Sequence, residues 1–281
     1  METLIHYFEN IPSLHRSLIL VGGIAFFWVL EGIVPLYRGA YAKWKHAIPN
    51  FFFTITTIIV NFGLAFLLLS TADWVQTNNF GIINQFDMPL WLYILLGVLL
   101  LDLIGAYTAH WVEHKVKPLW MVHLVHHSDH HVDTTTANRH HPLESVVRFV
   151  FTLVGVVVAG APIGVIMLYQ SLSVVTSQLN HANIRLPEKL DLWLSYIIVS
   201  PNMHKVHHHY VLPYTDANYG NIFSLWDRLF GTYMYLNPAN IQYGVDVFPD
   251  EKENASIKGL LRQPFQPYRK PTTGRVDTVP E

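Results

Sequence analysis

Four apolar segments, each close to the length of a membrane-crossing helix or longer, constrain the fold of this chain more than any other feature. A helix needs about twenty residues to cross the hydrocarbon core of a bilayer. Only 14% of the 281 residues are charged, whereas a typical soluble domain has about a quarter. We therefore predict an all-α integral membrane protein. The apolar segments are Leu18 to Leu36, Ile48 to Ser70, Met88 to Ala109 and Val146 to Gln178.

The last segment differs from the other three. Its 33 residues, counted from 146 to 178, are too few for two crossings of about twenty each. The sequence AGAP at 159–162 interrupts it and favours a helical hairpin that enters and leaves by the same face. One long kinked crossing is the alternative. We predict about three full spans plus this re-entrant or broken hairpin, with the first apolar segment kept as a helix and not cleaved.

Charge in the connecting loops predicts the orientation. The loop after the first segment carries Arg38, Lys43 and Lys45, whereas residues 71–87 contain no Lys or Arg. The positive-inside rule places the first loop in the cytoplasm. The third span then brings His110 to the cytoplasmic face. The hairpin keeps the later histidines on that face, in a histidine-rich helical cap.

Histidine is concentrated in one part of the chain. Fourteen of the seventeen histidines lie between His110 and His209, mostly in HWVEH, HLVHH and HKVHHH. Side chains three or four positions apart share a helix face, so each of these groups projects its imidazoles together. Pro118 predicts a turn between the first two groups, and Ser200 with Pro201 predicts a helix start before the third.

These clusters predict a metal centre. The chain contains no cysteine, so any ligands must be nitrogen or oxygen atoms. Eight converging imidazoles exceed the four that a tetrahedral site uses, which favours two ions about 3.5–4 Å apart. Imidazole suits Zn, Cu, Fe and Ni, so the spacing leaves the metal open. No HExxH motif of a zinc protease is present.

The motifs resemble one known family. HWVEH, HLVHH and HKVHHH, with RHHPLE at 139–144 and NYGNIFSLWDRLFGTY at 218–233, are similar to the fatty acid hydroxylase/sterol desaturase superfamily of membrane di-iron oxygenases, over about residues 85–235. The resemblance implies two iron ions, for which zinc can substitute on purification, and O₂ as co-substrate. The metal ligands that it implies are His110, His114, His123, His126, His127, His204, His207 and His208, with His181 as a ninth.

Other residues near the motifs are candidates for the layer around the ligands. Metal-bound histidines usually donate their second N–H to a carboxylate or carbonyl. We expect Glu113 to lie on a solvated helix face, and His130, His131 and His209 to lie outside the ligand set. The candidates for contacts behind the ligands are Asp102, Glu144, Asn180 and Asp227, together with His141, which is equally a candidate ligand.

The resemblance implies a membrane lipid hydroxylase or desaturase. We expect residues 1–237 to form the di-metal oxygenase domain and 238–281 a polar cytoplasmic tail. No GxGxxG fingerprint is present, so electrons are expected from an external ferredoxin or cytochrome b5 with its reductase. Activity should fall below about pH 6, where imidazole protonates.

Two functions other than a lipid oxygenase are compatible with histidine clusters in a membrane protein. The alternatives are a divalent-metal transporter, whose ligands normally lie near the bilayer midplane, and a metal-dependent membrane hydrolase. The 18 basic and 20 acidic residues give no sign of nucleic-acid binding. The lipid substrate, which could be a sterol, a fatty acyl chain, a carotenoid or an ether lipid, and the oligomeric state stay open.

Overall fold

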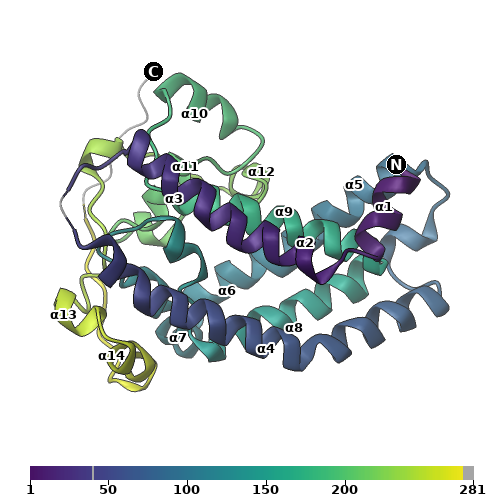
Figure 1. Cartoon of the computed structure of the whole chain (residues 1–281), viewed down its shortest axis with the longest axis horizontal. Coiled ribbons are helices and arrows are strands. Elements are labelled where there is room, and N and C mark those ends of the chain that lie inside the picture. Colours follow the sequence, from purple (N-terminus) through teal and green to yellow (C-terminus); the bar gives the residue numbers. More distant parts are fainter. Residues whose placement is uncertain (40, 275–281) are drawn as a thin grey trace.

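The computed structural model describes residues 1–39 and 41–274, and its regular structure there is helical. Extended pairing in this part is limited to isolated bridges, such as Pro35 with Ile184. The all-α prediction is confirmed. The helices, as labelled in Figure 1, are α1 (Glu2–Glu9), α2 (Ser13–Ser17), α3 (Gly23–Ile33), α4 (Lys43–Thr77), α5 (Leu90–Leu101), α6 (Ala109–Lys115), α7 (Lys117–His127), α8 (Pro142–Ala159), α9 (Ile163–His181), α10 (Glu188–Leu194), α11 (Pro201–His207), α12 (Leu225–Leu229), α13 (Glu251–Asn254) and α14 (Ile257–Arg262).

The long helices form a bundle along the longest axis of the molecule (Figure 1). A π-helical segment, Asp102–Thr108, joins α5 to α6 without a break. The main core lies between α4, α5, α8 and α9 and includes Leu68, Val98, Val156 and Val165. Among the described residues, four helices are long and apolar enough to cross a membrane: the three predicted spans and α8, one arm of the predicted hairpin. Their bounds are Ser13–Ile33, Lys43–Gln85, Leu90–Lys115 and Pro142–Ala159.

Helices α8 and α9 form the predicted hairpin. Gly160 ends α8 in the left-handed conformation, with φ of 81°, and Pro162 precedes α9. The arms have 18 and 19 residues. They are longer than predicted, because α8 begins before residue 146 and α9 ends after residue 178. Side chains of Gln76 and Asn84 donate to the carbonyl of Gly160. The turn thus reaches the α4–α5 connection, at the end of the bundle opposite α7 and α11 (Figure 1).

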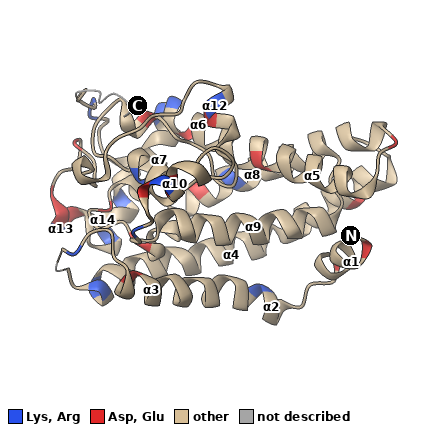
Figure 2. Cartoon of the chain, turned by 90° about the horizontal axis from the view of Figure 1, so that it is seen from above, with Lys and Arg blue, Asp and Glu red and all other residues tan. Residues whose placement is uncertain are grey.

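Most charged residues lie around the cap formed by α6, α7 and α10–α14, while the long helices are largely uncharged (Figure 2). The predicted polar tail, 238–281, belongs to this cap over its described part. Val245 and Phe248 pack against Trp120, and Leu260 is fully buried with Phe53 and Val125. These buried apolar side chains join the described part of the tail to the cap and to α4, and the predicted boundary at 237/238 stays a prediction. Residues 275–281 lie outside the described part.

The contact between Gly81 and Gly160 generates a stability prediction. Both residues have positive φ, 94° and 81°, and a Cβ on Gly81 would overlap the backbone of Gly160. Gly81→Ala should lower the free energy of unfolding by about 1–3 kcal/mol, measured by thermal unfolding of the purified protein. Gly63→Ala, at a helical position with nothing within 4 Å, is the matched control and should be neutral or stabilising by up to about 1 kcal/mol. Equal effects of the two substitutions would contradict the close approach.

Candidate metal centre

Four helix ends bring the histidines together, and the sequence shows why each helix stops or starts there. Lys117 and Pro118 open α7 directly after α6, so the two histidine helices lie side by side. The Ser200 side chain caps α11 by accepting from the Met203 N–H, and Pro201 occupies its first turn. The predicted turn near Pro118 and the predicted helix start at Ser200 and Pro201 are both confirmed. His181 is the last residue of α9, so the return arm of the hairpin supplies the remaining imidazole.

The imidazoles form two groups, each of which could hold a metal ion. Within a group, the available ligand atoms lie within 4.8 Å of one another. Every one of the nine predicted ligands falls in one of these groups. Their role as ligands stays a prediction, since the groups are defined by geometry alone. The first group is His110, His114, His123, His127 and His207; the second is His126, His181, His204 and His208.

The second group shows why a cation fits. The Nε2 atom of His181 lies 3.1 Å from Nε2 of His126, 3.1 Å from Nε2 of His204 and 3.2 Å from Nε2 of His208. One N–H can be donated to one acceptor, so four converging nitrogens cannot satisfy one another. Ligand nitrogens about 2.0–2.1 Å from a tetrahedral ion lie about 3.3 Å apart. The observed spacing is close to that.

The first group also contains imidazole nitrogens that converge or, within the described residues, lack a hydrogen-bond partner. His123 Nε2 lies 3.0 Å from His110 Nε2 and 3.1 Å from His127 Nε2. The Nε2 atoms of His114 and His207 are buried and have no hydrogen-bond partner in the described part of the chain. Buried polar atoms of this kind are rare in folded proteins. The donor set therefore fits metal ions in both groups.

Several imidazoles are held by their other nitrogen. Nδ1 of His110 bonds to the Tyr219 carbonyl at 2.8 Å, and Nδ1 of His207 to the Ala217 carbonyl at 2.6 Å. Nδ1 of His181 bonds to the Ser177 carbonyl at 2.7 Å. A carbonyl can only accept, so these three rings carry their proton on Nδ1 and leave the Nε2 lone pair for a metal.

The electrostatics of the cap favour uncharged imidazoles. Burial lowers the pKa of His123 to about 4, although the Glu144 carboxylate acts in the opposite direction. Burial, followed by the neighbouring imidazoles, holds the pKa of His126, His127 and His208 well below its ordinary value. At neutral pH these rings are therefore neutral, with one N–H and one free lone pair, and the neutral ring is the form that binds metals.

Glu144, which was predicted to lie behind the ligands, contacts the candidate ligand His123. One carboxylate oxygen, Oε1, accepts from Nδ1 of His123 at 2.8 Å, from Nδ1 of His140 at 2.6 Å and from Nε of Arg148 at 3.0 Å. His140 also stacks on His126, with ring centroids 4.8 Å apart. His140 and Arg148 were not among the predicted site residues. Each lies four positions from Glu144, and this spacing was the available signal.

Glu113 corrects one expectation. It was expected on a solvated helix face, but its side chain is 1% exposed. Its Oε2 atom lies 2.7 Å from Nη2 of Arg148 and 3.9 Å from Nδ1 of His123. The prediction was wrong because α8 packs against this face of α6 and brings a guanidinium to the carboxylate. Two buried carboxylates, Glu113 and Glu144, thus share Arg148 behind a candidate ligand.

The other predicted acidic residues act on the backbone and not on the imidazoles. Asp102 accepts from the N–H groups of Ile222 and Phe223 and from the Trp226 indole. Asp227 accepts from the Tyr219 and Gly220 N–H groups at 2.8 Å. Because the Tyr219 carbonyl holds His110, Asp227 supports that ligand through the backbone.

Asn180 has a related role. Its side chain donates to the Asn221 carbonyl at 2.9 Å, beside the candidate ligand His181. Together with Asp102 and Asp227, it fixes the segment at 218–227. This segment is the NYG-to-WD part of the motif that the sequence analysis singled out.

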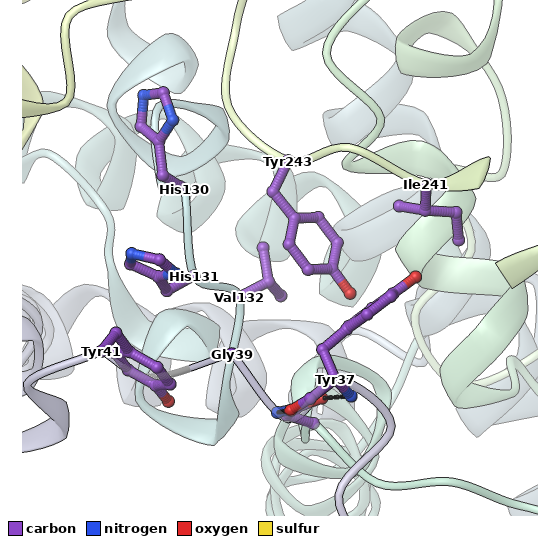
Figure 3. A pocket seen from close by; sticks show the side chains of 9 residues that line it. Tyr37, Gly39, Tyr41, His130, His131, Val132, Ile241 and Tyr243 are labelled. Atoms are coloured by element: carbon purple, nitrogen blue, oxygen red, sulfur yellow. Dashed lines mark hydrogen bonds between the residues drawn. The ribbon is translucent and has the colours of Figure 1, made fainter. Parts of the chain in front are cut away.

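The remaining histidines lie outside both groups. His141 caps α8 by accepting from the Leu143 N–H, and Nδ1 of His209 accepts from the Gln242 N–H. His130 and His131 line a cleft of about 210 Å³ on the cap, beside Tyr41 and Tyr243 (Figure 3). None of the nine predicted ligands lines this cleft. His46 precedes the histidine-rich part of the sequence, and its Nε2 atom lies 2.7 Å from Oδ1 of Asp129.

Glu144 offers a direct test of the layer behind the ligands. Glu144→Gln removes the charge that holds the proton on Nδ1 of His123, so metal affinity should fall about 10–100-fold, as measured by competition with a chelator. Glu253→Gln, at an exposed position on α13, is the control and should bind metal normally. Unchanged affinity in Glu144→Gln would show that the carboxylate does not support the centre.

Comparison with known proteins places the whole motif region in one family. The family model for fatty acid hydroxylase matches residues 94–232. Those residues include all nine histidines of the two groups. No solved structure gives a significant match.

Three individual relatives are each less than 30% identical to this chain. The chain is 27% identical to the ornithine lipid hydroxylase OlsE of Rhizobium tropici, over 64% of this chain and 51% of that protein. It is 29% identical to alkylglycerol monooxygenase of Xenopus tropicalis, over 61% of this chain and 37% of that protein, and 24% identical to methylsterol monooxygenase 2-2 of Arabidopsis thaliana, over 78% and 82%. The chain thus spans about half or less of the length of the first two. Both histidine groups lie within the matched residues, so residues 94–232 of this chain belong to the fatty acid hydroxylase family.

Proposed function

We propose that this protein is a membrane lipid monooxygenase whose nine histidines hold two iron ions. The observation that supports this most strongly is the convergence of nine buried imidazoles in two adjacent groups within the residues that match the family. Such ions, when bound, supply the activation of O₂ that attack on an unactivated C–H bond requires. The chain itself supplies binding, orientation and a dry environment.

The proposed reaction has two variants, hydroxylation and desaturation. One C–H bond of the lipid, O₂, two electrons and two protons give a C–OH bond and one water. In the desaturase variant, two C–H bonds of the lipid, O₂, two electrons and two protons give a C=C bond and two waters. Both variants consume two electrons from outside. We propose a ferredoxin or a cytochrome b5 with its reductase as the donor, because no dinucleotide fingerprint is present in the sequence.

The residues of the centre have distinct roles in this proposal. The Tyr219 and Ala217 carbonyls hold the rings of His110 and His207 in one tautomer. Glu144 does the same for His123. Burial excludes water, which limits loss of reactive oxygen to solvent.

We propose a membrane lipid as the substrate. The relatives are named for an ornithine lipid, an alkylglycerol and a methylsterol, and a lipid is what these substrates share. The histidine groups lie at one end of the apolar bundle, so a substrate could reach them from the bilayer without passing through water. We also propose that this end faces the cytoplasm, since Arg38, Lys43 and Lys45 lie there.

The reaction is tested with labelled dioxygen. Iron-loaded protein in lipid vesicles should consume O₂ only when an electron donor is present, and one ¹⁸O atom per turnover should appear in a lipid if the product is an alcohol. An alkene product would show a lipid lighter by two hydrogens and no label. His204→Ala should abolish both outcomes, because the second histidine group loses one of its four members. Lys258→Ala, at an exposed cap position, should keep full activity.

Two results would overturn the proposed reaction. In the first, every lipid stays unchanged in the presence of a competent electron donor and ¹⁸O₂, while the wild-type protein moves Fe²⁺ or Zn²⁺ across the membrane of sealed vesicles. The other is lipid hydrolysis that requires the metal but neither O₂ nor electrons. The first would favour a transporter, and the second would favour a hydrolase.

The orientation has its own test, which the absence of cysteine makes simple. A single cysteine at Lys43 should react with an impermeant thiol reagent only from the cytoplasmic side, and one at Asn78 only from the opposite side. Labelling is measured on right-side-out and inverted vesicles, with the cysteine-free protein as the blank. Reaction of both positions from one face would contradict the proposed topology.

A further inference from the structure

An apolar surface without a partner in the described structure lies on the flank of the cap. Figure 1 shows α10 and α12 on the same side of the bundle. Large apolar side chains of α10, of the turn after it, and of α12 point outward; Trp193 is 75% exposed, and Ile197 and Leu229 are each 65% exposed. We name this surface the α10–α12 platform. It comprises Leu190, Leu192, Trp193, Tyr196, Ile197, Leu225, Leu229 and Phe230.

The two parts of the platform are joined by hydrogen bonds. The Ser224 N–H donates to the Ile197 carbonyl, and the Val199 N–H donates to the Ile222 carbonyl. The Arg228 guanidinium donates to the Ser195 carbonyl. It also lies between the rings of Tyr196 and Tyr233, at 4.4 and 4.1 Å. The outward apolar side chains therefore belong to a fixed surface and not to a loose segment.

The platform continues the lipid-facing surface of the spanning helices on one side. Just before α10, Leu186 packs against the same buried cluster, Phe27, Ala182 and Ile184, as Leu30 of α3. The Arg185 N–H donates to the Val34 carbonyl. Near this junction, α3 exposes Val29 and Ile33, at 63% and 69%. A spanning helix that exposes such residues turns them toward lipid. The apolar surface of α3 thus runs into α10.

The same continuity holds on the other side. Phe230, which follows α12, stacks on Tyr107 of the π-helical segment, with ring centroids 5.3 Å apart. Phe223 packs against the same buried cluster, Tyr107, Tyr219 and Trp226, as Leu99 and Leu103, which belong to the third candidate span. The platform therefore bridges two candidate spans at the histidine end of the bundle.

We propose that the α10–α12 platform lies in the lipid leaflet at the histidine end of the bundle, with its apolar side chains below the headgroups. Trp, Tyr and Arg on its surface are the residues that anchor proteins at the boundary between headgroups and acyl chains. An apolar surface of this extent is uncommon on a protein face that meets water. The proposal depends on the membrane location of the bundle and not on the proposed reaction.

The platform also supports the candidate metal centre. Asp191 of α10 accepts from the Ser200 hydroxyl at 2.8 Å and from the Asn202 N–H at 3.1 Å. Ser200 caps α11, the helix that carries His204 and His207. On the α12 side, Asp227 holds the backbone of Tyr219. Contact with the leaflet would thus steady the two segments that position candidate ligands.

Spin-label depth measurements test the proposal. Because the chain has no cysteine, Ile197→Cys and Leu229→Cys each give one nitroxide site in full-length protein reconstituted in phosphatidylcholine vesicles. The readout is the collision rate with O₂, which concentrates in the bilayer, and with a water-soluble nickel chelate. Phe62→Cys is the lipid reference, because Phe62 of α4 is 84% exposed. Lys258→Cys, on the exposed face of α14, is the aqueous reference.

The platform sites should show nickel collision rates several-fold below that of position 258, and O₂ collision rates closer to that of position 62. Nickel rates equal to those of position 258 would overturn the proposal. Exclusion of both reagents would also overturn it, because a protein partner would then cover the surface. Each labelled variant is checked for wild-type metal content, which shows that the cap is folded. Failure of lipid oxidation would leave these depth readings unaffected, so the two proposals fail separately.

Discussion

Nine buried imidazoles that cannot satisfy one another are the constraint on which the rest of the structure depends. Each neutral ring has one N–H and one lone pair, and in the second group one nitrogen lies within 3.2 Å of three others. Burial disfavours the charged form of the imidazoles, so protonation of the rings does not relieve this conflict. Divalent ions between the nitrogens would resolve the conflict, and the Glu144 carboxylate, which also contacts His140 and Arg148, places negative charge behind His123.

The fold converts a membrane bundle into a scaffold for that centre. Helices α6 and α9 each end at the cap with a candidate ligand, so the depth of the spans sets the position of the imidazoles. The short helices α7 and α11 complete the two groups. Their starts are fixed by Pro118, Ser200 and Pro201. Loop segments that would otherwise be mobile are held by buried carboxylates, Asp102 and Asp227, through backbone N–H groups.

Local features were predictable from the sequence, whereas contacts between distant segments were not. Spacing along a helix places His110 with His114 and His204 with His208, and AGAP marks the hairpin turn, because both depend on residues close in the chain. The environment of Glu113 was missed because it depends on Arg148 of α8, 35 positions later by sequence number. The packing of Leu260 against Phe53 was missed for the same reason. Position in a polar stretch is a weak guide to burial when only a few apolar side chains are involved.

The central claim is that the two histidine groups hold two metal ions through nitrogen ligands. X-ray absorption at the iron edge, with metal content determined on the same iron-loaded sample, tests it most directly. The account predicts about two ions per chain, nitrogen neighbours at about 2.0–2.2 Å and no sulfur neighbours. His126→Ala and His114→Ala, one in each group, should each lower occupancy. A single ion per chain in the wild-type protein, or occupancy unchanged in both variants, would contradict it.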